Sequence, residues 1–184
     1  MNGDEVHRVL DALAAAGVEA GIGGGWGIDA LLRRETRNHL DLDLGVDAAQ
    51  VADAIDALGP LGYAVAVDER PARLELHAAQ GRVDLHPIVW QPDGSGLQTG
   101  FGGRTFLYPR GSLSAAGAIG QRPVACATPE LQLAFHLDYE PRDVDRLDMA
   151  ALASAFGLEL PPAYSGSRIR SARGPVMPQS DKDA

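Results

Sequence analysis

Residues 21–44 have the sequence Gly21-Ile-Gly-Gly-Gly-Trp-Gly-Ile-Asp-Ala-Leu-Leu-Arg-Arg-Glu-Thr-Arg-Asn-His-Leu-Asp-Leu-Asp-Leu44, which begins rich in glycine and ends with two aspartates separated by one leucine. The alternation at its end predicts a strand over residues 40–46, with Asp41 and Asp43 on one face. The opposite face is expected to carry Leu40, Leu42 and Leu44. Neighbouring carboxylates repel each other unless a cation lies between them. Because Mg²⁺ binds hard oxygen ligands, often together with substrate phosphates, this strand is a candidate Mg²⁺ site.

The glycines of the same stretch predict a phosphate-binding turn. Gly23, Gly24 and Gly25 precede residues 26–32, whose apolar spacing is that of a short helix. A glycine-rich turn at the start of a helix lets backbone N–H groups approach a phosphate, and the helix N-terminus favours negative charge. A helix-capping turn followed by a strand with solvated aspartates is the simpler alternative, which these residues alone leave open.

Three other motifs do not fit the stretch. The dinucleotide pattern Gly-x-Gly-x-x-Gly, started at Gly21, would need glycine where the chain has Trp26. A P-loop needs a lysine after its last glycine, whereas the one lysine of the chain is Lys182. A calcium loop that began at Asp41 would need glutamate at its twelfth position, which is Ala52.

Residues 22–44 resemble the signature of small antibiotic nucleotidyltransferases in the DNA polymerase β-like superfamily, namely aminoglycoside 2''-adenylyltransferases and lincosamide nucleotidyltransferases. The resemblance implies that Gly24 and Gly25 bind nucleotide phosphates and that Asp41 and Asp43 bind Mg²⁺. It also implies an α/β (α+β) fold, a nucleotidyltransferase core of a mixed twisted sheet with flanking helices, plus a smaller, mainly helical C-terminal part. Leu40 departs from the family pattern, in which a polar or small residue often precedes the first metal aspartate.

The composition restricts the class of partner. With 184 residues, 45% of them hydrophobic and 22% charged, the chain holds one globular domain or two small ones. A net charge of −9 argues against nucleic acid and suits a cationic small molecule. The single cysteine, Cys126, allows no internal disulfide, which fits a reducing cytoplasm. We expect neither a signal peptide nor a membrane span.

The periodicity along the chain predicts its remaining elements. We expect further helices over residues 4–16, 48–58, 129–137 and 142–156, and strands over residues 18–22, 63–67, 74–77 and 82–90, with two or three short strands before residue 125. Asp4 is the expected N-cap of the first helix. We predict a nucleotidyltransferase core at residues 1–92, an acceptor-binding part at residues 93–164 and a disordered tail at residues 165–184. Residues 127–152 resemble the lincosamide branch more than the aminoglycoside branch.

A third carboxylate is expected from the strand over residues 82–90. In it Val83 and Leu85 point one way, while Asp84 and His86 point the other. Since adjacent strands lie about 4.8 Å apart, Asp84 completes a cluster with Asp41 and Asp43 if the two strands pair. The superfamily resemblance implies such a carboxylate. His86 is either a substrate contact or a packed histidine.

The resulting hypothesis is transfer of a nucleoside monophosphate, AMP from ATP, to a hydroxyl of a small antibiotic. Asp41 and Asp43 would hold Mg²⁺, and Asp84 would complete a second Mg²⁺ site or accept the hydroxyl proton. Gly24 and Gly25 would steer the phosphates. Arg37 and His39, just before the metal strand, can donate to phosphate but can equally be solvated loop residues.

The acceptor is assigned from charge. An acidic run comprises Asp138, Glu140, Asp143, Asp145 and Asp148. With the tail removed, the charge of the body is −11, because the tail carries four basic and two acidic residues. This favours the ammonium groups of an aminoglycoside over a lincosamide. A solvated helix face with Arg142 and Arg146 as ion-pair partners is the alternative.

Other functions remain open on the sequence alone. A minimal nucleotidyltransferase antitoxin that acts on a partner protein has the same glycine and Asp-x-Asp core but usually lacks a C-terminal helical half. A nucleotidyltransferase of small-molecule biosynthesis is a further alternative. A decayed binding module is disfavoured because all three carboxylates are present. The sequence does not assign the oligomeric state.

Overall fold

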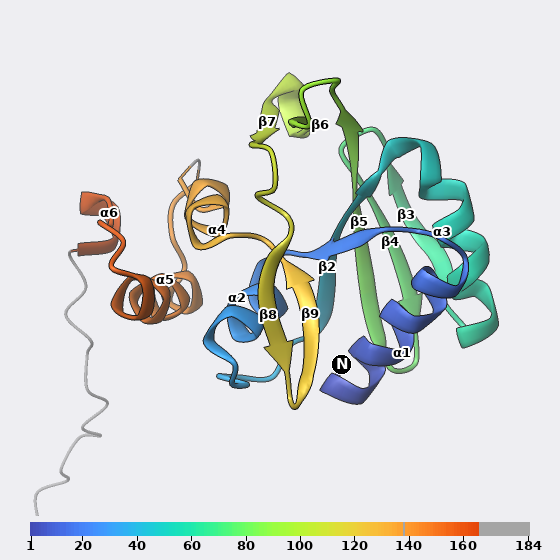
Figure 1. The fold of residues 1–184 in the computed structure, drawn as a ribbon, viewed down its shortest axis with the longest axis horizontal. Helices are drawn as coiled ribbons and strands as arrows, with labels where there is room; N and C mark the ends of the chain where they lie inside the picture. Colours follow the sequence, from blue (N-terminus) through green and yellow to red (C-terminus); the bar gives the residue numbers. More distant parts are fainter. Residues whose placement is uncertain (138, 166–184) are drawn as a thin grey trace, which may run out of the picture.

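The structure of the protein, a computed structural model, describes residues 1–137 and 139–165. One mixed sheet forms its centre, in the strand order β3-β4-β5-β2-β1-β9-β8, with β6 and β7 continuing from β5 (Figure 1). The strands are β1 Ala20–Ile22, β2 Asp41–Asp47, β3 Ala64–Glu69, β4 Arg73–Ala78, β5 Gly81–Trp90, β6 Gly96–Thr99, β7 Thr105–Tyr108, β8 Ala115–Ile119 and β9 Arg122–Cys126. The predicted mixed sheet with flanking helices is confirmed.

Helices cover one face of this sheet and lie beyond the end of it that β8 and β9 form (Figure 1). They are α1 Gly3–Ala15, α2 Gly24–Leu32, α3 Val51–Leu58, α4 Pro129–Phe135, α5 Asp143–Phe156 and α6 Pro162–Ser165, with 3-10 turns at Ala48–Gln50, Gly59–Leu61 and Phe101–Gly103. The predicted helix over residues 48–58 therefore begins as a 3-10 turn. The N-cap of α1 is Asn2, whose side chain accepts from the backbone N–H of Glu5 at 2.9 Å, and the Asp4 assignment was wrong. The described part of the chain contains no helix long and apolar enough to span a bilayer.

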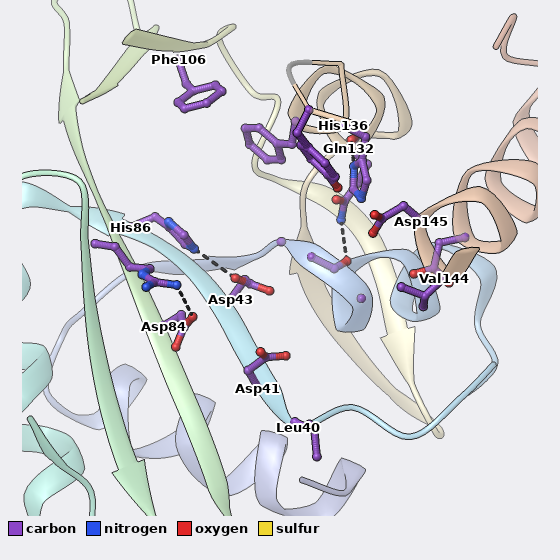
Figure 2. A pocket seen from close by; sticks show the side chains of 18 of the residues that line it. Leu40, Asp41, Asp43, Asp84, His86, Phe106, Gln132, His136, Val144 and Asp145 are labelled. Atoms are coloured by element: carbon purple, nitrogen blue, oxygen red, sulfur yellow. Dashed lines mark hydrogen bonds and ion pairs between the residues drawn. The ribbon is translucent and has the colours of Figure 1, made fainter. Parts of the chain in front are cut away.

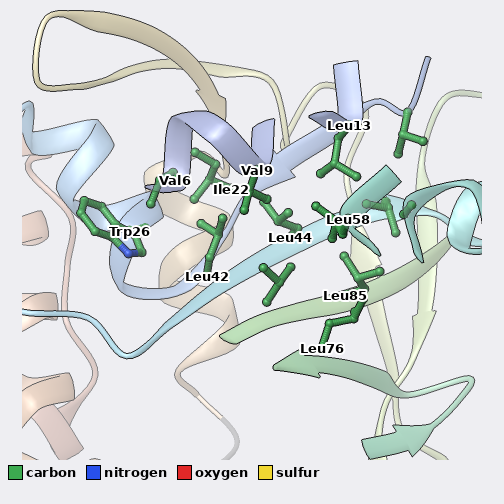
Figure 3. Packing of buried hydrophobic residues seen from close by; sticks show 14 of the residues in the cluster. Val6, Val9, Leu13, Ile22, Trp26, Leu42, Leu44, Leu58, Leu76 and Leu85 are labelled. Atoms are coloured by element: carbon green, nitrogen blue, oxygen red, sulfur yellow. The ribbon is translucent and has the colours of Figure 1, made fainter. Parts of the chain in front are cut away.

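The core lies between α1, α3 and one face of the sheet (Figure 3). Val6, Val9 and Leu13 recur at helical spacing on α1 and are buried against the sheet. The strands contribute their alternate side chains, Leu42 and Leu44 from β2, Leu74 and Leu76 from β4, and Val83 and Leu85 from β5, all fully buried. Burying one such aliphatic side chain contributes about 1.5–3 kcal/mol, so this face fixes the register of each strand.

The register decides what the other face carries. β2 and β5 are parallel, with Asp43 opposite Asp84 and Gly45 opposite His86. The pairing on which the expected carboxylate cluster depends is therefore present. Contrary to the prediction, Leu40 does not fill the apolar face. It precedes β2, is 70% exposed and lines the cavity described below.

The C-terminal strands complete the sheet beside the glycine-rich segment. β9 runs parallel to β1, with Ile22 opposite Cys126, and β8 pairs with β9 as a hairpin. The proposed division of the chain at residue 92 stays a prediction, since strands from both sides of it share this sheet. From residue 166 onward the predicted tail lies outside the described residues, as does Asp138.

Candidate active site

A cavity of about 610 Å³ opens over the polar face of β2 and β5. Figure 2 shows Asp41, Asp43, Asp84 and His86 on the sheet, with Gln132, His136, Val144 and Asp145 on the helical elements across from them. The cavity therefore lies between the predicted nucleotide-binding residues and the C-terminal helices α4 and α5.

The three predicted carboxylates differ in their surroundings. Asp41 is half exposed, and its carboxylate lies 3.9 Å from Arg82 Nη2. Asp43 accepts a hydrogen bond from His86 Nε2 at 3.1 Å. Burial raises the pKa of Asp43, but the hydrogen bond from His86 and the nearby positive charge of Arg73 together outweigh burial, so the pKa lies below its ordinary value. Asp43 is therefore held as a carboxylate.

Asp84 is the carboxylate of the three whose negative charge is least stabilised. It is buried, its Oδ2 lies 3.6 Å from Arg73 Nη1, and its Oδ1 has no hydrogen-bond partner within the described residues. Burial, followed by the charges of Asp43 and Glu75, raises the pKa of Asp84 to about 6. A nearby cation or a proton from a substrate hydroxyl would relieve this carboxylate.

The three carboxylates are suitable ligands for Mg²⁺, both in their chemistry and in their positions on the two paired strands. Asp41, Asp43 and Asp84 project from two paired strands toward one cavity, and Asp84 Oδ1 is buried without a partner. Carboxylate oxygens are the ligands that Mg²⁺ prefers. As the side chains stand, no three acidic, histidine or cysteine groups of the described residues converge as a metal site. His86 contacts one oxygen of Asp43, and Arg73 lies near one oxygen of Asp84.

The glycine turn, residues Gly23, Gly24 and Gly25, is packed tightly from both sides. Gly24 has φ +54°, and a Cβ there would stand 1.9 Å from Asp43 Oδ2. A Cβ on Gly25 would stand 2.4 Å from His39 Nδ1 and 2.6 Å from Arg37 Nη2. These positions require glycine because the metal-strand aspartate and the loop residues touch the turn itself. Gly24 and Gly25 form the first turn of α2, which begins two residues earlier than predicted.

The two predicted phosphate donors lie in different environments. Arg37 lines the cavity and donates to Asp148 on α5, with Nη2 at 2.9 Å from Oδ2. His39 is 3% exposed and does not line the cavity. Its Nε2 lies 2.5 Å from Asp29 Oδ2, and its ring lies 4.7 Å from that of Trp26. The surroundings of His39 are those of a buried support of the glycine turn, and its role as a phosphate donor remains a hypothesis.

The Asp29 carboxylate organises the loop that contains His39. It also accepts from the backbone N–H and hydroxyl of Thr36, at 3.1 and 2.5 Å. Burial raises the pKa of Asp29, but the bonds from His39 and Thr36 lower it further than burial raises it. The chain folds back to make these bonds because Arg33 ends α2 in the left-handed conformation, with φ 53°.

The acidic run is largely paired with arginines. Asp145 forms a capping ion pair with Arg142 at 2.8 Å, and Asp148 binds Arg37. Glu140 is highly exposed, lies 3.2 Å from Arg146 and does not line the cavity. These contacts match the alternative of a helix face paired with arginines, and they leave less free negative charge than the sequence predicts. Asp138 is outside the described residues.

An aromatic wall, formed by Phe106, Tyr108 and Phe135, lines the cavity. The ring of Phe135 lies 6.2 Å from that of Phe106 and 5.4 Å from that of Tyr108. The sequence did not single out these residues, nor Arg73, Gln98 and Gln132, which also line the cavity. Gln132 links α4 to the glycine turn, since its Nε2 donates to Gly24 O at 3.2 Å. Of these residues, only Arg73 had a signal in the sequence, because it belongs to the polar residues at alternate positions of β4.

A glycine turn opens α2, β2 carries alternate aspartates and its parallel neighbour β5 carries a third, which is the arrangement that the resemblance of residues 22–44 implies. A sequence profile described as aminoglycoside-2''-adenylyltransferase matches residues 5–152. The chain belongs to this family, and the resemblance of residues 22–44 is thereby confirmed. It is an enzyme of the antibiotic nucleotidyltransferase type.

Individual relatives fall in both branches of the family. A lincosamide resistance protein of Staphylococcus haemolyticus is 32% identical over 151 residues, which are 82% of this chain and 93% of the relative. A 2''-aminoglycoside nucleotidyltransferase of Escherichia coli is 29% identical over 66% of this chain and 64% of its own length.

Two solved structures show the same fold with an antibiotic bound. A lincosamide antibiotic adenylyltransferase bound to lincomycin has a TM-score of 0.72 at 32% identity, over 82% of this chain and 96% of its own. ANT(2'')-Ia in complex with adenylyl-2''-tobramycin has a TM-score of 0.66 at 25% identity, over 83% of this chain and 88% of its own.

Proposed function

We propose that the protein transfers AMP from ATP to a hydroxyl group of a lincosamide-type antibiotic, in a reaction that requires Mg²⁺. The observation that carries the choice of acceptor is the aromatic wall, which faces a cavity in which Asp145 and Asp148, the acidic side chains of α5, are paired with arginines. A lincosamide has one amine and a larger apolar share than an aminoglycoside, so it suits such a surface. The relatives that act on each class support the general reaction.

In this proposal each carboxylate has a separate role. Asp41 and Asp43 would hold the divalent cation, which when bound would neutralise charge on the triphosphate and stabilise an in-line displacement. Asp84 would accept the proton of the attacking hydroxyl. The hydroxyl oxygen forms a bond to the α-phosphorus, the bond from that phosphorus to the bridging oxygen breaks, and pyrophosphate leaves.

The raised pKa of Asp84 suits this assignment. A carboxyl with a pKa of about 6 is a stronger base than an ordinary aspartate, yet it is mostly ionised at neutral pH. Its Oδ1, the buried oxygen without a described partner, is available to receive the proton. The first-turn N–H groups of α2 would bind the phosphates, because the first N–H groups of a helix have no partner within it.

Aminoglycosides are the second candidate acceptor, and they were the one favoured by the sequence. Asp145 and Asp148 line the cavity despite their arginine partners, and a polycation can displace an arginine from a carboxylate. If this is the binding mode, acceptor affinity falls steeply with ionic strength, since the Debye length is about 8 Å at physiological salt. Lincosamide affinity should change little.

The test is an acceptor screen with ATP and Mg²⁺, in which lincomycin and tobramycin are compared and products are scored by mass for one added AMP. Calorimetric titration at low and high salt would accompany it. We expect adenylylated lincomycin and a salt-insensitive titration. Adenylylated tobramycin with unmodified lincomycin would reject the aromatic wall as the acceptor surface and restore the aminoglycoside assignment.

A variant tests the aromatic wall directly. Phe106→Ala should raise the KM for lincomycin about tenfold, because an aromatic contact and its buried area are worth well over 1 kcal/mol. The KM for ATP should not change. Phe156→Ala is the matched control, since Phe156 is 44% exposed on α5 and does not line the cavity. Equal effects of the two variants on the lincomycin KM would contradict the assignment.

A further inference from the structure

Behind His86 lies a chain of buried polar side chains whose hydrogen bonds the reaction as proposed does not use. Tyr108 on β7 and Gln98 on β6 are 3% and 6% exposed. The Tyr108 hydroxyl donates to Gln98 Oε1 at 2.6 Å, and Gln98 Nε2 contacts both Ala72 O and His86 Nδ1 at 3.1 Å. His86 Nε2 in turn contacts Asp43 Oδ1 at 3.1 Å.

The direction of every bond in this chain follows from one atom. Ala72 O is a backbone carbonyl and can only accept, so the Gln98 nitrogen must face it. That nitrogen carries two protons, and the second points to His86 Nδ1. Nδ1 is therefore the acceptor, and the ring proton of His86 resides on Nε2, from which it is donated to Asp43 Oδ1.

This arrangement also assigns the two oxygens of Asp43. Oδ1 receives the proton of His86, whereas Oδ2 lies against Gly24, where a Cβ would approach it to 1.9 Å. Oδ2 is thus the oxygen turned to the glycine turn and to the phosphates that the turn would bind. With Nδ1 accepting from Gln98 and Nε2 donating to Asp43, neither ring nitrogen of His86 is turned to a substrate.

We propose that Gln98 is a positioning residue, which holds His86 as the Nε2–H tautomer and thereby orients the Asp43 carboxylate toward the glycine turn. The expected effect of Gln98 on the reaction rate rests on the nucleotidyl transfer proposed above. The tautomer itself does not depend on that function. Gln98 acts through His86 and Asp43, and it touches neither substrate in this scheme.

The decisive substitution is Gln98→Glu, which keeps the shape of the side chain and removes its donor. A carboxylate can only accept, so His86 Nδ1 must carry a proton to keep this contact. The ring then presents to Asp43 either an unprotonated Nε2 or the Nε2–H of a charged imidazolium. We expect kcat to fall about ten- to a hundredfold, the range for a hydrogen bond to a charged group, with a smaller change in the KM for the acceptor. Gln121→Glu, on the exposed β8–β9 turn, is the matched control and should behave as wild type.

A readout independent of activity comes from nitrogen-15 NMR of the five histidines, since the shifts of the two ring nitrogens distinguish the tautomers. At alkaline pH, where imidazoles are neutral, wild-type His86 should show a protonated Nε2, and Gln98→Glu should change this pattern. The His86 signals are identified by their loss in His86→Gln. A Tyr108→Phe variant should keep the tautomer, because Ala72 O still orients Gln98.

Rescue separates positioning from simple packing. His86→Gln places an amide N–H where Nε2 was and should retain more activity than His86→Leu, although both fill the space. A protonated Nδ1 on wild-type His86, or wild-type turnover and an unchanged tautomer in Gln98→Glu, would overturn the proposal. If wild-type protein modifies no antibiotic, the function proposed above fails instead, and the NMR result still decides the role of Gln98.

Discussion

Gly24→Ala tests the contact between the glycine turn and the metal strand. An alanine Cβ would stand 1.9 Å from Asp43 Oδ2 and 2.8 Å from its Cγ, at a residue with φ +54°. The left-handed conformation costs a non-glycine residue about 1–2 kcal/mol. The carboxylate must also move, and losing its hydrogen bond from His86 costs about 1.5–3 kcal/mol. We expect the free energy of unfolding to fall by about 3 kcal/mol and nucleotidyl transfer to be nearly abolished.

Two other glycines separate the cost of the left-handed backbone from the cost of the contact with Asp43. Gly17 has φ +72°, but a Cβ there meets no described atom within 4 Å, so Gly17→Ala should show the backbone cost alone, about 1–2 kcal/mol, with unchanged transfer. Gly59 has φ −53° and equally open surroundings among the described residues. Gly59→Ala should be neutral or stabilising by about 0.4–1 kcal/mol.

Urea unfolding and single-turnover transfer would be measured for all three variants. The expected order of stability is Gly59→Ala, Gly17→Ala and Gly24→Ala, with transfer lost in the last alone. If Gly24→Ala were no less stable than Gly17→Ala and retained the wild-type rate, Asp43 Oδ2 would not lie against the turn, and the assignment of its two oxygens would be wrong.

Three further substitutions probe the carboxylates. Asp43→Asn should abolish transfer while the protein still folds with a modestly lower thermal midpoint, because the lowered pKa of Asp43 means that the folded state favours its charged form; transfer at the wild-type rate would refute the metal assignment. Asp84→Asn should stabilise the protein in a pH-dependent way. The folded-state pKa of Asp84 is raised to about 6 from 3.8, so the stability that its protonated form contributes is full below pH 3.8 and is lost as the pH rises to 6. The variant should therefore gain stability relative to wild type over this window, by roughly 3 kcal/mol at most at pH 7, and a pH-independent difference in urea unfolding would contradict this. Asp29→Ala should lower the free energy of unfolding by about 3 kcal/mol or more, because it leaves the buried His39 unpaired; wild-type stability in this variant would show that the loop is held by other contacts.

The polar face of the sheet could be predicted because its determinants are local. Alternation in Asp41-Leu-Asp-Leu44 and in Val83-Asp-Leu85 fixes which side chains face the core, and burial of the leucines then imposes the register that places Asp43 opposite Asp84. Leu40 was misplaced because the alternation does not reveal where a strand begins. It lies one residue outside β2, beyond the apolar cluster that covers the sheet.

Contacts between distant residues could not be predicted. The pair of Arg37 and Asp148 joins positions 111 residues apart, so the acidic run looked free in the sequence although it is largely neutralised. His39 looked like a loop residue because its burial depends on the left-handed Arg33, which turns the chain back onto Asp29. Gln98 lies on β6, which pairs with β5, and Tyr108 lies on β7, which pairs with β6; the alternation specified neither pairing.

The parallel pairing of β1 with β9 has a consequence for the order in which the nascent chain can fold. Ile22 and Cys126 are neighbours in the sheet but 104 positions apart, since 126 − 22 = 104. Domains fold as the chain emerges at about 5–20 residues per second, so β1 waits on the order of five to twenty seconds for this partner. Until then, one edge of the strand that leads into the glycine turn lacks β9. Ribosome-bound chains in which residues 122–126 have not yet left the ribosome should therefore leave the glycine segment sensitive to protease, and chains long enough for these residues to have emerged should protect it.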